Sequence, residues 1–278
     1  MFYLLCAIVS SALVSIIMRL STDKVENNIS MLAMNYLMCS TVAAAYAGFG
    51  QLFPQTDTLG LTLGMGVFQG ILYLLSFILL QVNVKKNGVV LPATFMKLGL
   101  LVPMVISILL FREIPAPMQI VGFCIATAAI LLINLDKSQS AVSFKIGLVL
   151  LLLINGTGDA MAKVYEEIGD PALSAQFLFY TFAIAFILCM GLVAAKKQKV
   201  GKNELFYGFL VGVPNYFSAK FLLAALNTVP AVITYPTYSV GTILLVTLTG
   251  VGFFKEKLGK KQWIGLGIIL VALILLNM

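Results

Sequence analysis

FREIPAPMQIVGFCIATAAILLIN, at residues 111–134, returns in altered form as FKEKLGKKQWIGLGIILVALILLN at residues 254–277. Aligned without gaps, the two copies share eight of their 24 residues, and Arg112 is answered by Lys255. Apolar identities arise by chance between hydrophobic helices. The ordered set of Phe, a basic residue, Glu, Gln, Gly and a closing Asn is harder to obtain by chance, and it indicates an internal duplication.

The composition places this duplication in a membrane. Hydrophobic residues make up 60% of the chain, charged residues only 10%, and the mean hydropathy is +1.03. Soluble domains typically carry about 25% charged residues, so a soluble helical protein is excluded. The net charge of +7 does not indicate a nucleic-acid partner, because the basic residues fall in short loops between apolar runs. They are typical of orientation signals and lipid-headgroup contacts.

The apolar runs are long enough to span a bilayer, which takes about 20 residues each. The first run starts at Met1 and lacks a basic region before it and a small-residue cleavage site after it, so we interpret it as a retained helix. The sequence predicts an all-α integral membrane protein with ten transmembrane helices and no domain outside the membrane. The expected spans are 2–18, 30–49, 58–82, 88–111, 114–135, 144–163, 171–195, 204–226, 229–253 and 260–277.

The repeated phrase closes each half of this series. We therefore predict a first five-helix repeat over 1–138 and a second over 139–278. Because five is odd, the two copies must cross the membrane in opposite directions. Inverted repeats of this kind are typical of secondary transporters, which bind substrate near the midplane and alternate its access. Helices 1, 3, 4, 6, 8 and 9 are expected to contact the substrate.

The repeated ending resembles that of the drug/metabolite transporter superfamily, in particular the ten-helix EamA-type proteins. Tyr235-Pro-Thr-Tyr238-Ser239 is also similar to the aromatic–x–x–aromatic–Ser motif of the small multidrug resistance proteins. The resemblance implies the fold and a role in transport. It departs at one position, because the embedded Glu of the small exporters is replaced by Ser11, and by Asn155 in the second copy. This departure argues against their exchange of protons for cationic drugs.

Three ionisable residues, Lys97, Asp159 and Lys220, fall well inside the expected spans. Each costs ~2.5–3.5 kcal/mol on insertion scales, so each needs a reason to be there. Asp159 and Lys220 should lie at similar depths, and we predict that they face a common cavity and pair. Two cations and one acid favour an anionic or zwitterionic metabolite, such as an amino acid or an organic acid. The alternatives are a structural ion pair and, for Lys97, a side chain that reaches the interface.

Further polar and aromatic residues complete the predicted substrate site. Gln69, Asn155 and Asn215 could form hydrogen bonds with a substrate, or could instead bond neighbouring helices. Aromatic walls could come from Tyr73, Phe95, Tyr216, Tyr235 and Tyr238, although aromatic residues at helical spacing are usually core packing. Glu113 and Glu256 are expected to be structural, by capping the next helix or pairing with Arg112 and Lys255.

Catalysis and cofactor binding are not expected. The chain has no histidine, and Cys6, Cys39, Cys124 and Cys189 form no closely spaced pair. We therefore expect no metal, no cofactor, no disulfide framework and no enzymatic activity. The rival functions are a multidrug or lipophilic-cation exporter and, from other classes, a channel or an intramembrane enzyme.

Loop charges predict the orientation. One set of loops carries 14 basic residues and the other only two, Arg112 and Lys163. The positive-inside rule then places both termini outside the plasma membrane. The expected partners are a small-molecule substrate and membrane lipid, with monomer and homodimer both open. The 14 residues are Arg19, Lys24, Lys85, Lys86, Lys137, Lys145, Lys196, Lys197, Lys199, Lys202, Lys255, Lys257, Lys260 and Lys261.

Overall fold

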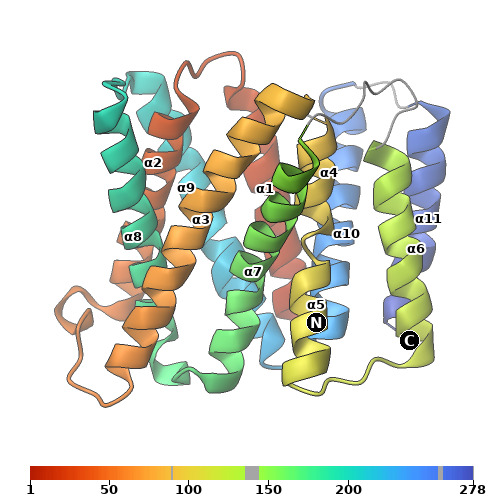
Figure 1. Ribbon diagram of the computed structural model, residues 1–278, viewed down its shortest axis with the longest axis horizontal. Helices are drawn as coiled ribbons and strands as arrows, with labels where there is room; N and C mark the ends of the chain where they lie inside the picture. Colours follow the sequence, from red (N-terminus) through yellow and green to blue (C-terminus); the bar gives the residue numbers. More distant parts are fainter. Residues whose placement is uncertain (89, 135–143, 256–258, 278) are drawn as a thin grey trace. The chain divides into compact units, whose positions relative to one another are not determined.

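A computed structural model describes residues 1–88, 90–134, 144–255 and 259–277 (Figure 1). These residues form α-helices joined by short connections, two of which contain a turn of 3-10 helix, and no strand occurs among them. The α-helices are α1 Phe2–Ser21, α2 Asn28–Ala47, α3 Leu59–Asn87, α4 Val90–Leu98, α5 Leu101–Leu110, α6 Pro117–Asn134, α7 Lys145–Ile168, α8 Ser174–Ala195, α9 Lys202–Leu226, α10 Ala231–Gly252 and α11 Lys260–Leu276.

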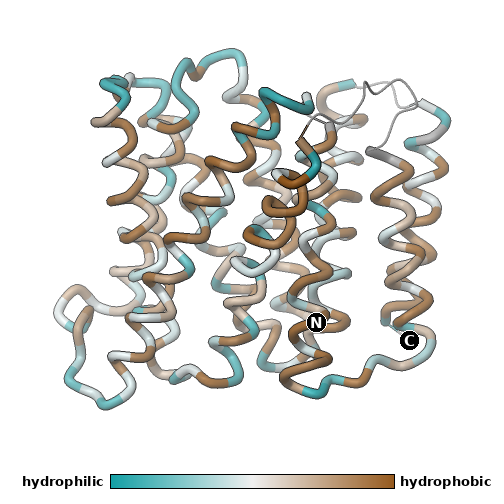
Figure 2. The backbone as a smooth tube through the Cα atoms, in the orientation of Figure 1, coloured by the Kyte–Doolittle hydropathy of each residue, from teal (hydrophilic) through white to brown (hydrophobic). Residues whose placement is uncertain are grey.

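The ten expected spans are all present. Among the described residues, eight helical segments are long and apolar enough to cross a membrane, and the consecutive helices α4 and α5 together form one of them. The remaining two, α6 and α11, are shorter apolar helices. The residues along the helices are mainly hydrophobic, whereas hydrophilic residues gather in the connections (Figure 2). The prediction of an all-α membrane protein with ten spans is therefore confirmed.

Most helix ends differ from the sequence-based expectation by a few residues, and the ends of α3 and α7 differ most. Helix α7 continues to Ile168, so Lys163 lies inside a helix and is not a loop residue. Helix α3 continues to Asn87 and carries Lys85 and Lys86 in its last turn. Lys and Glu are good helix formers, so a helix can continue past the point where its apolar run stops. Arg19, Lys85 and Lys86 lie in the last turns of their helices and stay in the orientation count, because the positive-inside rule includes residues near the ends of a span. The buried Lys163 leaves the smaller set. Lys137 and Lys257 lie outside the described residues.

The chain divides into two compact units. Unit 1 contains Met1–Leu74 and Val164–Ala225, and unit 2 contains Leu75–Lys163 and Leu226–Met278. Each unit therefore takes segments from both predicted repeats, and α3 and α7 pass from one unit to the other. The predicted repeat boundary at 138/139 lies outside the described residues. The division into repeats at 1–138 and 139–278 stays a prediction about how the sequence was duplicated. It does not coincide with the division into compact units.

In unit 1, α2 packs along α8. Small residues allow α3 and α9 to approach these helices closely. A Cβ added at Gly66 of α3 would lie 2.7 Å from the Cβ of Tyr180 on α8, and one added at Gly208 of α9 would lie 2.5 Å from the Cβ of Met34 on α2. Such close backbone contact through glycine is a common way for membrane helices to pack.

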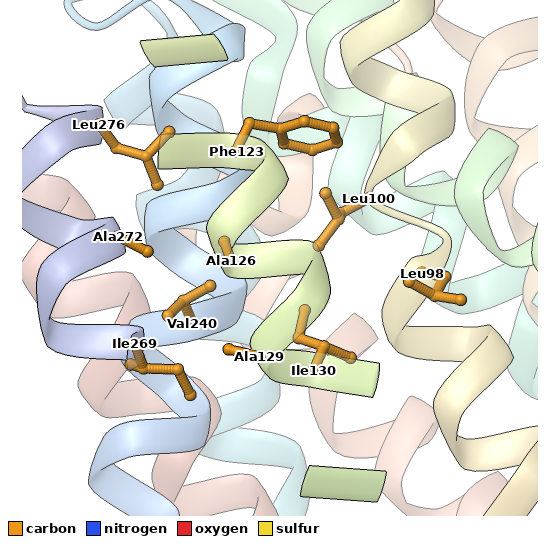
Figure 3. Packing of buried hydrophobic residues seen from close by; sticks show 10 residues of the cluster. All are labelled: Leu98, Leu100, Phe123, Ala126, Ala129, Ile130, Val240, Ile269, Ala272 and Leu276. Carbon is orange, nitrogen blue, oxygen red and sulfur yellow. The ribbon is translucent and has the colours of Figure 1, made fainter. Parts of the chain in front are cut away.

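In unit 2, the two copies of the repeated phrase pack on each other as α6 and α11 (Figures 1 and 3). Ala129 of α6 and its counterpart Ala272 of α11 are both fully buried in one apolar cluster. A Cβ added at Gly122 would lie 2.9 Å from the backbone nitrogen of Leu276. The repeated small residues thus form the faces through which the two helices contact each other. This packing gives the duplicated phrase a structural purpose.

The turn before each of these helices shares a rare backbone conformation. Arg112 has a φ of 54° and Lys255 has a φ of 52°, and both follow the repeated Phe. The left-handed region costs a residue with a Cβ roughly 1–2 kcal/mol. The sequence match therefore extends to the backbone, which supports the predicted duplication.

Replacing Lys255 by glycine should stabilise the protein, since glycine adopts the left-handed region without steric cost. We expect Lys255→Gly to raise the free energy of unfolding by about 1 kcal/mol and Lys255→Val to lower it by a similar amount. Both variants remove the same charge, so thermal unfolding in detergent isolates the backbone effect. A Gly variant less stable than the Val variant would contradict this account of the turn.

Candidate functional site

The fourth span is broken in the middle. Helix α4 ends at Leu98 and α5 begins at Leu101. The backbone nitrogen of Gly99 still donates to the carbonyls of Phe95 and Met96, both at 3.1 Å. Pro103 has no N–H and therefore cannot donate the usual helical hydrogen bond to the carbonyl of Gly99. That carbonyl accepts from the backbone nitrogen of Val102 at 3.0 Å instead. We call residues 98–101 the α4–α5 break.

Helix α7 lies directly against this break. The side-chain nitrogen of Asn155 donates to the carbonyl of Met96 at 3.3 Å, near the end of α4. A Cβ added at the next residue, Gly156, would lie 2.4 Å from the carbonyl oxygen of Gly99 and 2.5 Å from Cγ2 of Val102. Asn155 thus binds a carbonyl just before the break, and Gly156 permits the close contact. Broken helices are tolerated in membranes where neighbouring groups satisfy the backbone in this way.

Polar side chains from several helices of unit 2 converge beside the break. The Asn155 oxygen accepts from Ser76 Oγ at 3.1 Å, and Asn155 Nδ2 lies 3.2 Å from Asp159 Oδ2. Tyr235 of α10 donates its hydroxyl to the backbone carbonyl of Asp159 at 2.8 Å. Lys97, in the last turn of α4, interacts electrostatically with Asp159. We call these five residues the Lys97–Asp159 cluster.

The charged members of this cluster are the accessible ones. Ser76 and Tyr235 are buried, with 7% and 3% of their surface exposed, and Asn155 is half-buried. Lys97 and Asp159 are both exposed although they lie within membrane spans. The buried members hold the framework, while the ammonium and the carboxylate are the exposed groups, although the surrounding helices remove part of their hydration. Phe95 and Tyr238, the other candidates in unit 2, are half-buried on α4 and α10.

The amide candidates of unit 1 bond neighbouring helices. Gln69 has 4% of its surface exposed, accepts from Thr181 Oγ1 at 3.1 Å and donates to the Tyr73 hydroxyl at 3.3 Å. Asn215 of α9 donates to the side-chain oxygen of Asn35 on α2 at 3.2 Å. These contacts favour the alternative in which the amides join helices over a direct role in binding substrate.

Lys220 has an aromatic neighbour that the sequence did not indicate. Its ammonium lies 3.2 Å from the centre of the Tyr46 ring. This arrangement is a cation–π contact. Tyr46 stacks on Tyr216, whose side chain is fully buried, with 5.6 Å between ring centres. Asp159 belongs to unit 2 and Lys220 to unit 1, so their predicted pairing stays a prediction.

Glu113 has structural contacts, but not with the expected partners. One carboxylate oxygen lies 2.9 Å from the Lys163 ammonium, and the other accepts from the backbone nitrogen of Val232 at 3.1 Å. Glu113 therefore caps α10, not the next helix α6, and its ion pair is with Lys163 of α7, not with Arg112. Lys163 has only 4% of its side chain exposed. The second copy, Glu256, lies outside the described residues.

No cluster suited to a metal ion occurs in the part of the chain that the structure describes, as judged by groups of three or more His, Cys, Asp or Glu. The four cysteines are free thiols. The groups of the Lys97–Asp159 cluster can bind a ligand by charge and by hydrogen bonding.

Known proteins show what this chain resembles. The family model for EamA-like transporters matches residues 144–278. An uncharacterized protein of Haemophilus influenzae is 26% identical over 276 residues, which cover 95% of this chain and 93% of that protein. A solved crystal structure of another protein has a TM-score of 0.75 and 14% identity, and the match covers 99% of this chain and 94% of that one.

Two shorter relatives carry descriptive names. A probable 4-amino-4-deoxy-L-arabinose-phosphoundecaprenol flippase subunit, ArnE of Hamiltonella defensa, is 32% identical over 111 residues, or 37% of this chain and 96% of that protein. The multidrug resistance protein EbrA of Bacillus subtilis is 32% identical over 103 residues, or 36% of this chain and 94% of that protein.

Proposed function

Since this chain belongs to the drug/metabolite transporter superfamily as an EamA-like transporter, we propose that it carries a small zwitterionic or anionic metabolite across the membrane by alternating access. The observation that supports this substrate class is the Lys97–Asp159 cluster. Two opposite charges are accessible within membrane spans, beside a broken helix. Exposed charge facing lipid would be costly, so these groups are better explained by an aqueous substrate path.

The two charges suit the two ends of a zwitterion. The Lys97 ammonium can bind a carboxylate or phosphate, and the Asp159 carboxylate can bind an ammonium group. Asn155 bonds both the Met96 carbonyl, next to Lys97 in the sequence, and the Asp159 carboxylate, so it links Asp159 to the end of α4 that carries Lys97. A zwitterion suits this pair best, because Lys97 repels a ligand of net positive charge and Asp159 repels one of net negative charge.

A lipophilic-cation exporter is the second candidate, and the similarity to EbrA favours it. Asp159 could serve as the anionic group for such a substrate. Lys97 is the residue that opposes this reading, so the effect of removing its charge discriminates between the two candidates.

We also propose that the protein resides in the plasma membrane with its basic loops in the cytoplasm and both termini outside. The support is the loop charge, which remains strongly unequal after Lys163 is removed from the count. Positively charged loops are retained on the cytoplasmic side during insertion.

Ligand-induced thermal shifts of the purified protein test the substrate class. The panel would contain amino acids, organic acids and phosphates on one side, and quaternary amines and tetraphenylphosphonium on the other. We expect zwitterions or anions to stabilise the protein, and Lys97→Met to weaken their affinity at least about tenfold, a loss of ~1.4 kcal/mol. Asp159→Asn should weaken the affinity for zwitterions by a similar factor, without weakening the affinity for simple anions.

The matched control is Lys85→Met, which removes a lysine from the last turn of α3, outside the cluster. It should leave every ligand shift intact. If cations alone stabilise the protein, and do so better in Lys97→Met, the exporter becomes the correct function and the metabolite proposal is wrong.

A further inference from the structure

The outer face of α9 carries a shallow apolar hollow. Its volume is about 470 Å³, and it is lined by Lys202, Leu205, Phe206, Phe209 and Leu210. These positions follow the helical repeat along one face, starting at the first residue of the helix. Leu205, Phe206 and Leu210 have 43%, 60% and 43% of their surface exposed. The hollow thus has a cationic end at Lys202 and an open apolar floor.

Further lysines lie in two loops that hydrogen bonds connect to α9 and α2. Asn203 donates to the carbonyl of Lys24 at 2.8 Å, which ties the loop after α1 to the start of α9. Ser30 of α2 donates to the carbonyl of Lys199 at 3.2 Å. These bonds hold the loops 22–27 and 196–201 together at one end of unit 1. The exposed basic residues that they carry are Lys24, Lys196, Lys197 and Lys199.

Acidic groups at this end do not cancel the positive charge. Asp23 and Glu26 are exposed in the loop after α1. Glu204 has 5% of its surface exposed, and its Oε1 accepts from the backbone nitrogens of Glu26 and Asn27 at 3.0 and 3.2 Å. Its carboxylate is therefore directed at the framework. Counting Lys202, five lysines face three acids.

We propose that this hollow is a binding site for an anionic phospholipid, with the lipid phosphate at Lys202 and an acyl chain along Leu205, Phe206 and Leu210. Membrane lipid supplies an acyl chain that can cover the exposed apolar side chains of the hollow, and the lysines favour a negatively charged headgroup. A lysine near the end of a membrane helix can extend its ammonium to headgroup level. In the orientation proposed above, on which this inference rests, the hollow opens to the cytoplasmic leaflet, which is rich in anionic lipid.

Native mass spectrometry in a neutral detergent would test this site with two lipids of identical chains. We expect dioleoyl-phosphatidylglycerol to bind more tightly than dioleoyl-phosphatidylcholine. One lysine near an anionic membrane surface contributes about fivefold in affinity. Lys202→Gln should therefore lower the affinity for phosphatidylglycerol by about that factor. Free sn-glycerol 3-phosphate, which has the phosphate without chains, should not compete.

Two matched variants separate the site from general surface effects. Lys260→Gln removes an exposed lysine from the first residue of α11, and Phe68→Ala removes an exposed aromatic ring from α3. Neither variant should change lipid affinity, whereas Phe206→Ala should lower the affinity for both lipids. Equal binding of the two lipids, equal losses in Lys202→Gln and Lys260→Gln, or competition by the free phosphate would overturn the proposal.

Discussion

Replacing Gly156 by alanine should cost about 3 kcal/mol of folding free energy, because it inserts a methyl group where there is no room. The new Cβ would lie 2.4 Å from the Gly99 carbonyl and 2.5 Å from the Val102 side chain. One of these atoms is backbone at the α4–α5 break, so relief requires α7 to move away. That movement would also pull Asn155 from the carbonyl of Met96. A large fall in the unfolding temperature in detergent is the expected result.

Gly191→Ala supplies the control for this prediction. Gly191 lies inside α8, and a Cβ added there meets no atom within 4 Å. Alanine is the better helix former, so this variant should gain roughly 0.5–1 kcal/mol. The two substitutions are chemically identical and should move the unfolding temperature in opposite directions. Similar shifts in both variants would mean that α7 does not contact the break as closely as described.

The spans were predictable because the membrane sets a single strong requirement, a long apolar run. The repeated phrase was equally informative, because Ala129 and Ala272 occupy equivalent places in the α6–α11 contact. The α4–α5 break was not predictable to the residue, since Pro92 and Pro103 both lie in that span and nothing marks Gly99. Proline alone is a poor guide, because α9 continues through Pro214 and α10 through Pro236.

The candidate site was predictable where a polar side chain is costly at membrane depth. Lys97, Asp159 and Asn155 stand out in apolar runs because each needs a polar partner there. Ser76 gave no such signal, since a serine hydroxyl can bond a carbonyl of its own helix. Tyr46 was also missed as the neighbour of Lys220. Depth arithmetic along a helix gives the height of a residue but not the direction of its side chain, so partners cannot be assigned from it.

Truncating Glu113 should be strongly destabilising. Its carboxylate joins the turn after α5 to Lys163 of α7 and to the first turn of α10. Breaking a buried ion pair by removing one partner typically costs about 3–5 kcal/mol, since the remaining charge loses its compensation. We expect Glu113→Ala to lower the unfolding temperature about as much as Gly156→Ala does, and to reduce the yield of folded protein.

A series of variants separates the two contacts of Glu113. Glu113→Gln keeps an oxygen that can accept from the Val232 nitrogen but removes the negative charge, so it should recover only the capping part, about 1 kcal/mol. Lys163→Met in that background removes the opposing charge and should restore stability, because a matched uncharged pair is often as stable as a buried ion pair. Glu26→Ala, at an exposed acid, should have little effect. If the double variant is no more stable than Glu113→Gln, the ion pair with Lys163 is not what makes Glu113 important.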